Sequence, residues 1–252
     1  MIQGHRVFDT HTHIGAARHS GRVFTAEQML RSMDTHGVDR SLLIPYPVVD
    51  DYRAQHDEIG AAVRQWPDRF AGAACLNPFV KESEFRDEVK RCAESYGFRA
   101  LKLQPMYQPL NPVSRRSDFF FESAQANGMA VVAHTGSGVP LSLPSLYIAA
   151  ARRFPELTIV LGHAGSPLFM LECAVAADVC PNIYVEVSSL MPHHLAELMQ
   201  LIPASRLMAG SDLPESVETE IGKVFSLAMS EADRQAILWE TGARLFGTGK
   251  EM

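Results

Sequence analysis

Two histidines near the start of the chain carry the strongest chemical signal in the sequence. They stand in the run Phe8-Asp-Thr-His-Thr-His13. Side chains alternate faces along a strand, so His11 and His13 point to the same side. Two imidazoles placed in this way can share one divalent cation, with zinc the commonest expectation and iron, nickel or manganese as alternatives. Surface histidine pairs have the same spacing, so the pair alone does not decide for a metal site.

Three further titratable residues, His134, His163 and Asp212, each end an apolar run and are followed by a turn. A polar residue at such a place is often only a cap for the next helix, so each is a weak signal alone. Together with the histidine pair, they put His or Asp at four predicted strand ends. This pattern favours one shared site at the carboxyl ends of the strands.

The elements that must position these residues recur eight times, each as a short apolar run, a turn and an amphipathic stretch. We predict strands over Val7–Ile14, Ser41–Pro45, Phe70–Leu76, Ala100–Gln104, Ala130–His134, Thr158–His163, Ile183–Val187 and Leu207–Asp212. Successive runs end 24 to 32 residues apart, which leaves room for one helix and two short loops. Eight such units predict an α/β fold of the (β/α)8 TIM-barrel type. Barrels of this type have about 250 residues and gather their active-site residues at the carboxyl ends of the strands.

Helix signals lie between the predicted strands. The segment Thr25-Ala-Glu-Gln28 is typical of a capping box, and Gly37 is predicted to end the helix that it begins. Two helices are predicted after the last strand, over Glu215–Ala228 and Glu231–Phe246. No linker or low-complexity segment divides the chain, so we predict one domain over residues 1–252.

Composition limits the partners and the compartment. The formal net charge of −6, without a concentrated basic face, argues against nucleic acid or anionic lipid as the main partner. No apolar run is long enough to span a membrane, and no secretion signal is recognisable. The four cysteines form no CxxC pair and are expected to be reduced, which favours the cytoplasm. A homodimer is compatible with the sequence, although no feature fixes an interface.

The sequence resembles the amidohydrolase superfamily, and within it the amidohydrolase-2 branch that includes aminocarboxymuconate-semialdehyde decarboxylase. The resemblance runs through FDTHTH, LKLQP, VVAHTG, IVLGHAG, MAGSDLP and ARLFG, in this order along nearly the whole chain. It departs from the branch at LKLQP, where KLHP is common, and before ARLFG, where an Asn-Ala pair is common. The first departure bears on substrate contacts and the second on packing of the last helix.

The resemblance implies roles for the strand-end residues. His11, His13, His134 and Asp212 would hold one divalent metal ion, with Zn²⁺ expected first and Mn²⁺ or Fe²⁺ as alternatives. Asp212 would also carry a proton during catalysis. His163 would either help to hold the metal or orient water and polarise the substrate.

Lys102 requires its own argument, because it is predicted to point into the barrel. A buried ammonium without a partner is costly. Three interpretations stay open: a carboxylated lysine that bridges two metals, a contact to a substrate carboxylate, or an ion pair with Asp9 or Glu186. We favour an ion pair, either structural or with the substrate, because the branch that the chain resembles is typically mononuclear.

Our first functional hypothesis is hydrolysis of an amide, lactone or ester of a small organic substrate. A bound cation lowers the pKa of water from 15.7 towards about 7. Asp212 would take the proton of the attacking water, and His163 would stabilise the charge that develops on the carbonyl oxygen.

The alternative is non-oxidative decarboxylation of an unsaturated or aromatic acid at the same metal site, with Lys102 or a loop arginine binding the acid. A third hypothesis, a barrel without catalysis, leaves the concentration of titratable residues at the strand ends unexplained. In either enzymatic case the partner is a small-molecule substrate, and an anionic substrate is compatible with the sequence.

The remaining histidines have simpler interpretations. His36 and His56 fall in predicted helices and are expected on solvated faces. His19 and Tyr46 fall in predicted loops at the mouth of the barrel and are candidates for the border of the substrate pocket.

Overall fold

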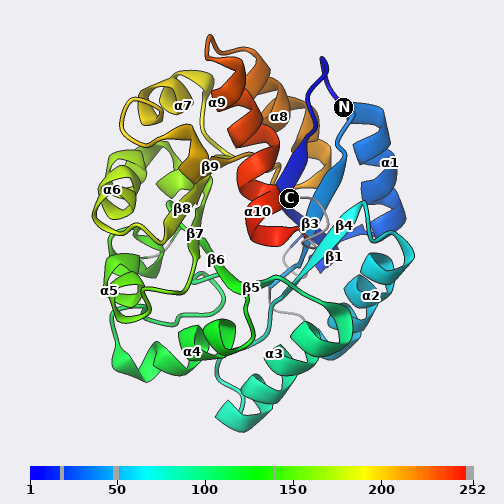
Figure 1. Ribbon diagram of the computed structural model, residues 1–252. Coiled ribbons are helices and arrows are strands. Elements are labelled where there is room, and N and C mark those ends of the chain that lie inside the picture. Colours follow the sequence, from blue (N-terminus) through cyan, green and yellow to red (C-terminus); the bar gives the residue numbers. More distant parts are fainter. Residues whose placement is uncertain (18–19, 48–50, 139, 248–252) are drawn as a thin grey trace.

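A ring of parallel strands forms the centre of the protein (Figure 1). The computed structural model describes residues 1–17, 20–47, 51–138 and 140–247. The parallel strands are β1 (Phe8–Ala17), β3 (Arg40–Pro45), β4 (Phe70–Ala74), β5 (Ala100–Leu103), β6 (Ala130–His134), β7 (Ile159–Gly162), β8 (Ile183–Glu186) and β9 (Leu207–Met208). The parallel strands lie side by side in the same order as in the chain, so each connection between two neighbouring parallel strands contains one α-helix.

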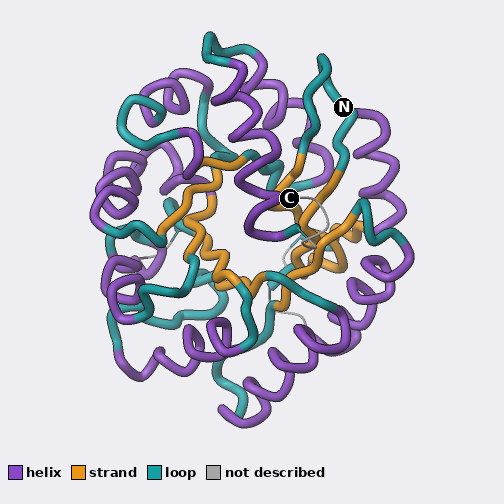
Figure 2. The backbone as a smooth tube through the Cα atoms, in the orientation of Figure 1, coloured by secondary structure: helices purple, strands orange, loops and turns teal. Residues whose placement is uncertain are grey.

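Backbone hydrogen bonds also join the first parallel strand to the last. Thr10 N donates to Ala209 O at 2.9 Å, and Asp212 N donates to His11 O at 2.7 Å. A parallel bridge pairs Thr12 with Asp212. The sheet is therefore closed, most of its helices surround the ring of strands, and the last one, beside the C-terminus, lies over one end of the ring (Figure 2). The predicted (β/α)8 fold is confirmed.

Helices follow each strand and surround the barrel. They are α1 (Ala26–His36), α2 (Tyr52–Gln65), α3 (Glu82–Tyr96), α4 (Asp118–Ala126), α5 (Leu146–Arg153), α6 (Ser166–Val179), α7 (Pro192–Leu198), α8 (Val217–Phe225), α9 (Glu231–Gln235) and α10 (Thr241–Phe246). The predicted capping box is present at the start of α1, and Gly37 ends this helix with a left-handed φ of 71°. A π-helical stretch, Ala236–Glu240, joins α9 to α10. No helix in the described ranges is long and apolar enough to cross a membrane.

One strand was not predicted. β2 (Arg22–Phe24) pairs antiparallel with the end of β1, which runs three residues beyond its predicted end at Ile14. Gly21, with a φ of 66°, lies in the turn that leads into β2. The extension lies at the carboxyl end of the barrel, beside the predicted mouth.

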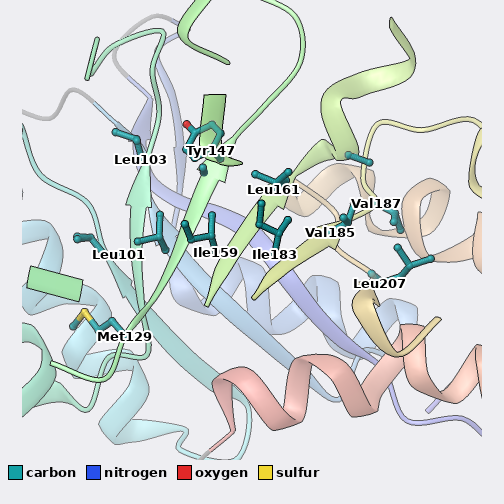
Figure 3. Packing of buried hydrophobic residues seen from close by; sticks show 14 of the residues in the cluster. Leu101, Leu103, Met129, Tyr147, Ile159, Leu161, Ile183, Val185, Val187 and Leu207 are labelled. Carbon is teal, nitrogen blue, oxygen red and sulfur yellow. The ribbon is translucent and has the colours of Figure 1, made fainter. Parts of the chain in front are cut away.

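The hydrophobic core has two layers. Side chains that point outward from the strands pack against the helices, as Leu101, Ile159, Leu161 and Val185 do in Figure 3. A second cluster fills the amino-terminal half of the barrel interior: Phe8, Leu42, Ile44, Ala71, Ala73, Ala100, Ala130, Val132, Val160, Met208, Trp239 and Phe246. Polar residues are concentrated in the carboxyl half of the interior, although the buried Arg40, at the start of β3, has its guanidinium 5.4 Å from the Phe8 ring.

Two strands show this change from apolar to polar along the inward face. On β5, Ala100 is followed two residues later by Lys102, and on β6, Val132 is followed by His134. The two-residue period of a strand keeps both residues of a pair on the same face. The floor of the site is thus built by the same strands that carry its functional groups.

Candidate metal centre

A bulge in β1 lies at the predicted histidine pair. The register between β1 and β3 shifts between Asp9 and Thr12. The Asp9 carboxylate accepts hydrogen bonds from His11 N at 3.2 Å, Ser211 N at 2.9 Å and Ser211 Oγ at 2.6 Å. Burial raises the pKa of Asp9 to about 7 despite these bonds. Bulges re-aim side chains, and here Asp9 fixes the bulge to the end of β9.

The rings of His11 and His13 lie 5.3 Å apart. His11 Nδ1 donates to Glu186 Oε2 at 2.8 Å, and His13 Nδ1 donates to Pro45 O at 3.2 Å. Because these carboxylate and carbonyl oxygens only accept, Nδ1 carries the hydrogen in both rings, and Nε2 of the neutral ring has the lone pair. Metal-binding histidines are oriented in this way by a partner of their second nitrogen.

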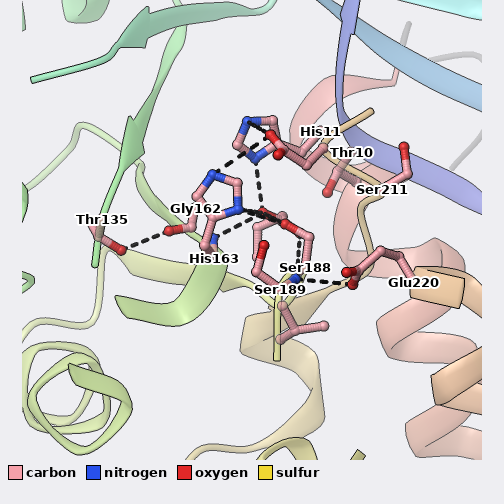
Figure 4. Close-up of polar contacts among 12 residues, drawn as sticks. Thr10, His11, Thr135, Gly162, His163, Ser188, Ser189, Ser211 and Glu220 are labelled. Carbon is pink, nitrogen blue, oxygen red and sulfur yellow. Dashed lines mark hydrogen bonds and ion pairs between the residues drawn. The ribbon is translucent and has the colours of Figure 1, made fainter. Parts of the chain in front are cut away.

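His163 is fixed by the same logic, through Ser188 (Figure 4). Ser188 Oγ donates to Glu186 Oε2 at 2.9 Å and therefore accepts from His163 Nδ1 at 2.7 Å. His163 N also donates to Glu186 Oε2 at 3.0 Å. The lone pair of the neutral His163 ring is thus on Nε2 as well.

Three Nε2 atoms converge on one carboxylate oxygen. Asp212 Oδ1 lies 3.9 Å from His11 Nε2, 3.8 Å from His13 Nε2 and 3.8 Å from His163 Nε2. Ligands of a tetrahedral ion with bonds of about 2.0–2.1 Å lie roughly 3.3 Å apart, so shifts of a few tenths of an ångström would seat an ion. The residues present fit a divalent cation.

The protonation states suit the same purpose. Burial lowers the pKa of His11, His13 and His163 well below the ordinary value, so all three rings are neutral at neutral pH. Burial raises the pKa of Asp212 to about 6, although the nearby Lys102 ammonium works to lower it. Neutral imidazoles can bind a cation, and a carboxyl group that titrates near neutrality can carry a proton.

Glu186 holds this arrangement from below. It is fully buried and accepts hydrogen bonds from both histidines that lie above it and from Ser188. Two glycines leave room for Glu186 and for the His11 ring. A Cβ on Gly210 would lie 2.6 Å from Glu186 Oε1, and a Cβ on Gly162 would lie 2.9 Å from His11 Cε1. Glu186 was predicted only as a partner of Lys102, and the two glycines were not predicted to matter.

The backbone is strained where the last strands end. His163, Ala164, Ser166, Ser189 and Asp212 all have a left-handed φ, between 50° and 65°. Non-glycine residues rarely adopt this conformation, and such strain gathers at functional sites. The left-handed backbone ends the strands at His163 and Asp212 and directs these two side chains into the barrel.

His134 lies beside these groups but outside the tightest set. Its ring is 4.8 Å from the His163 ring, and its Nε2 faces Ser137 O at 3.3 Å. Among the described residues, the set that brings ligand atoms closest around Asp212 contains His11 and His13 but not His134. Burial lowers the pKa of His134 to about 4, so this ring is also neutral.

Lys102 reaches the centre of the site. Its Nζ lies 2.7 Å from His11 Nε2, and its side chain is fully buried. In the described part of the chain, no carboxylate lies within ion-pair distance of Nζ; Asp9 is held by Ser211, and Glu186 by the histidines. The structural form of the favoured ion pair, with Asp9 or Glu186, is therefore not formed, and an ion pair of Lys102 with the substrate stays a prediction. Burial lowers the pKa of Lys102 to about 8, so the ammonium still prevails at neutral pH.

Two polar atoms of the wall have no protein partner. Within the described residues, Tyr46 Oη and Gln104 Oε1 are buried without a hydrogen bond. The Tyr46 ring stacks on His13 at 5.3 Å, and burial raises its pKa to about 12, so it remains a donor. Gln104 follows Lys102 by two residues. Both atoms are suited to contact a ligand, since buried polar groups are almost always paired. His19 lies outside the described residues.

The prediction for His56 was wrong. His56 is fully buried, donates from Nδ1 to Glu88 Oε1 at 2.7 Å and accepts from Cys75 N at 3.0 Å. The periodicity of α2 places it on a helix face, but only the packing of α3 against that face buries it.

Comparison with known proteins places the chain among enzymes of one family. The family model described as amidohydrolase matches residues 8–248. No curated protein matches the sequence. Solved structures share the fold at low identity. A 5-carboxyvanillate decarboxylase from Novosphingobium aromaticivorans, complexed with manganese, has 16% identity and a TM-score of 0.79, over 97% of both chains.

Two further structures are similar. A 2,6-dihydroxybenzoate decarboxylase from Rhizobium has 18% identity and a TM-score of 0.76, over 96% of this chain and 98% of the other. A probable 2-pyrone-4,6-dicarboxylic acid hydrolase from Acinetobacter baumannii has 16% identity and a TM-score of 0.70, over 96% and 99%. Decarboxylases and a hydrolase therefore share this barrel.

Proposed function

The chain belongs to the amidohydrolase family, and from this premise we propose that it is a metal-dependent hydrolase of a small organic amide, lactone or ester. The observation that carries the proposal is the convergence of three imidazole lone pairs on Asp212 Oδ1, at 3.8–3.9 Å. We propose His11, His13, His134 and Asp212 as the metal ligands. His163 has the tautomer and the distance of a further ligand and competes with His134 for that role.

A divalent ion held by these residues would polarise a carbonyl group and lower the pKa of water towards about 7. Zn²⁺ suits the imidazole-rich donor set, with Mn²⁺ and Fe²⁺ as alternatives; Mn²⁺ is the ion in the vanillate decarboxylase structure.

Asp212 moves the proton in the proposed reaction. Its side chain is 36% exposed, so it faces the substrate side of the site. Asp212 takes a proton from the attacking water and returns it to the leaving group. General acid–base help of this kind typically contributes 10²–10⁴-fold.

His163 supports this transfer. With Nδ1–H committed to Ser188, neutral His163 offers a lone pair at Nε2, so it can accept a proton beside Asp212. Once protonated, the ring can donate to a developing oxyanion, and the buried Glu186 carboxylate, 3.8 Å from Nδ1, stabilises its charge.

A second candidate function is non-oxidative decarboxylation of an unsaturated or aromatic acid. The observation that favours it is the buried Lys102 ammonium inside the site, a group that suits an acid substrate. Two of the structural neighbours are decarboxylases of hydroxylated aromatic acids. In this case water, or His163 after it has taken a proton at Nε2, would deliver the proton to carbon.

We expect a small organic molecule as the substrate, with an anion among the candidates, and the cytoplasm as the compartment. A homodimer is compatible with this function.

Metal analysis of untagged protein, purified without chelator, tests the proposal together with a panel of lactones, amides and carboxylic acids in ¹⁸O-labelled water. Hydrolysis puts ¹⁸O into the product, whereas decarboxylation releases carbon dioxide without that label in the organic product. Asp212→Asn should lower kcat by about 10²–10⁴-fold, and Asp178→Asn, at an exposed position of α6, should not. Normal turnover by Asp212→Asn that retains its metal would contradict the proposed role.

A further inference from the structure

One ion pair on α8 holds the backbone of the loop that follows β8. Lys223 Nζ donates to Val187 O at 2.6 Å and to Leu190 O at 3.0 Å. It also donates to Glu220 Oε2, which in turn accepts from Ser189 N at 3.0 Å (Figure 4). An ammonium has three donors, so all three donors of Lys223 are used in this arrangement.

The backbone of this loop needs such support. Ser189 has a left-handed φ of 64°, which a residue other than glycine rarely adopts. Its neighbours Ser188 and Leu190 are buried, and buried backbone groups must find partners within the protein. A strained conformation persists only where the surrounding structure determines it strongly. The contacts to Lys223 and Glu220 supply that determination at the end of β8.

Ser188 stands in this loop and connects it to the candidate site. Its Oγ accepts from His163 Nδ1 at 2.7 Å and donates to Glu186 Oε2. A displacement of Ser188 by about 1 Å would lengthen the contact to His163 beyond hydrogen-bond range. The position of the loop therefore decides whether the hydrogen of the neutral His163 ring is held on Nδ1, with the Nε2 lone pair towards Asp212.

We propose that Lys223 and Glu220 are positioning residues for His163, which act through the loop backbone and Ser188. This inference rests on the proposed function, because it takes His163 as the group that accepts a proton beside Asp212. The side chain of Lys223 is buried and its donors are used, so it supports the site without binding substrate.

Helix α8 thereby serves both members of the proposed proton-transferring pair. It begins five residues after Asp212, so the chain itself ties that carboxyl group to α8. His163 lies on the other side of the site, after β7, and is tied to the same helix through Ser188 and Lys223. The relative position of the two groups depends on this helix.

Arg206 offers a matched control at the opposite end of the same strand. Its Nε donates to Ile183 O at 2.8 Å, and its Nη2 donates to Cys180 O at 2.9 Å. Arg206, like Lys223, is a cation that donates to backbone carbonyls. It holds the amino end of β8, however, whereas Ser188 follows the carboxyl end. Arg206→Met therefore removes comparable support without releasing Ser188.

The first test combines Lys223→Met with Ser188→Ala and measures kcat at metal saturation. Lys223→Met alone should lower kcat about tenfold, the lower end of the range for groups that support a site residue. In the Ser188→Ala background it should lower kcat by no more than about twofold, because groups in one network are not additive. Arg206→Met should leave kcat unchanged, although urea unfolding should show a loss of stability.

The second test needs no turnover. In metal-free protein, the hydrogen-bonded Nδ1–H of His163 should give a low-field proton resonance, which its loss in Ser188→Ala assigns. The resonance should shift or disappear in Lys223→Met and stay in Arg206→Met. Glu220→Gln removes the charge that pairs with Lys223. It should change both measurements in the same direction, and it replaces Lys223→Met if that variant does not fold.

An equal loss of kcat from Lys223→Met in both backgrounds would overturn the positioning role and leave the proposed function standing. An unchanged His163 resonance in folded Lys223→Met would do the same. A tenfold loss of kcat in Arg206→Met would also overturn it, because the effect would then follow stability in general. A wild type without hydrolytic or decarboxylating turnover would overturn the proposed function, whereas the resonance would still report whether Lys223 holds the His163 ring.

Discussion

Histidine and carboxylate side chains are buried together in two places in this protein: inside the barrel around Asp212, and between α2 and α3 around Glu88. Residue types are alike in the two places, and only Asp212 is partly exposed. Both bring possible ligand atoms within 4.8 Å of one another, as His11, His13 and Asp212 do in the barrel and His56, Glu88 and Cys92 do between the helices. The two clusters differ in what their polar atoms are bound to.

The cluster between the helices is complete in itself. His56 uses both ring nitrogens, for Glu88 and for Cys75 N. Arg91 donates to both carboxylate oxygens of Glu88, at 2.6 and 2.9 Å. Burial works to raise the pKa of Glu88, but the hydrogen bonds from His56 and Arg91 hold it at about 2. No lone pair is left there for a metal, so this cluster is structural.

The cluster in the barrel keeps its lone pairs open. His13 and His163 each use Nδ1 for a protein partner and turn Nε2 towards Asp212. Over the described stretches of chain, no arginine pairs with Asp212, and its pKa is raised instead of lowered. The difference teaches that burial and composition do not distinguish the two clusters, whereas lone pairs that point at one place make the barrel cluster the better candidate for a metal site.

The largest effect should come from removing the metal with a chelator. Activity should fall at least about 10³-fold, because the metal supplies both polarisation and an acidic water, and added Zn²⁺ or Mn²⁺ should restore it. Far-UV circular dichroism should stay unchanged, since the cluster around Glu88 holds α2 and α3 without metal. Full turnover by metal-free protein would contradict the proposal that the barrel cluster, unlike the cluster around Glu88, acts through a metal.

Glu88→Gln should act on stability alone. Removing one partner of a buried ion pair typically costs about 3–5 kcal/mol, which urea unfolding would measure. The bound metal per chain should remain that of the wild type. Glu94→Gln, at an exposed position of the same helix, is the control and should change stability little. Loss of metal in folded Glu88→Gln would show that the two clusters are coupled.

The pH dependence of unfolding should sharpen the comparison further. The folded-state pKa of Glu88, about 2, lies below the ordinary value of 4.5. The stabilisation is therefore complete above about pH 4.5 and is lost as the pH falls towards 2, and a shift of this size is worth about 3 kcal/mol. Denaturant unfolding of wild type and Glu88→Gln between pH 2 and 5 should show a steeper loss in the wild type. Parallel curves would mean that Glu88 is not the group responsible.

Ser188→Ala should have the smallest effect, at the barrel cluster. It removes the acceptor of His163 Nδ1–H and a donor to Glu186. Loss of such a supporting hydrogen bond typically costs 10–100-fold in metal affinity or activity. Steady-state kinetics and metal titration would measure it, with Ser123→Ala, a buried serine of α4, as the control. An unchanged kcat and metal affinity would mean that His163 needs no fixed tautomer.

Much of this could be predicted from the sequence, because strand ends depend on local patterns. All eight parallel strands lie at the predicted places, and the capping box at Thr25 is present. The residues proposed for the site stand at the carboxyl ends of these strands or just beyond them. Their roles stay predictions.

What could not be predicted depends on contacts between distant residues. Alternation along β1 predicted that Asp9 faces the interior, but the bulge turns it to Ser211, 202 residues away. The burial of His56 depends on Glu88, 32 residues later on another helix. The approach of Lys102 to His11 spans 91 residues. Periodicity within one element contains no information on such pairs.

The pairing of β1 with β9 also determines when the barrel can close during biosynthesis. β1 leaves the ribosome first, yet Ser211, which fixes its bulge, and Asp212 follow about two hundred residues later. At 5–20 residues per second, that interval is roughly 10–40 s. During this time the nascent chain carries His11 and His13 beside an unpaired strand edge. The proposed metal site is complete only after the last strand has been translated.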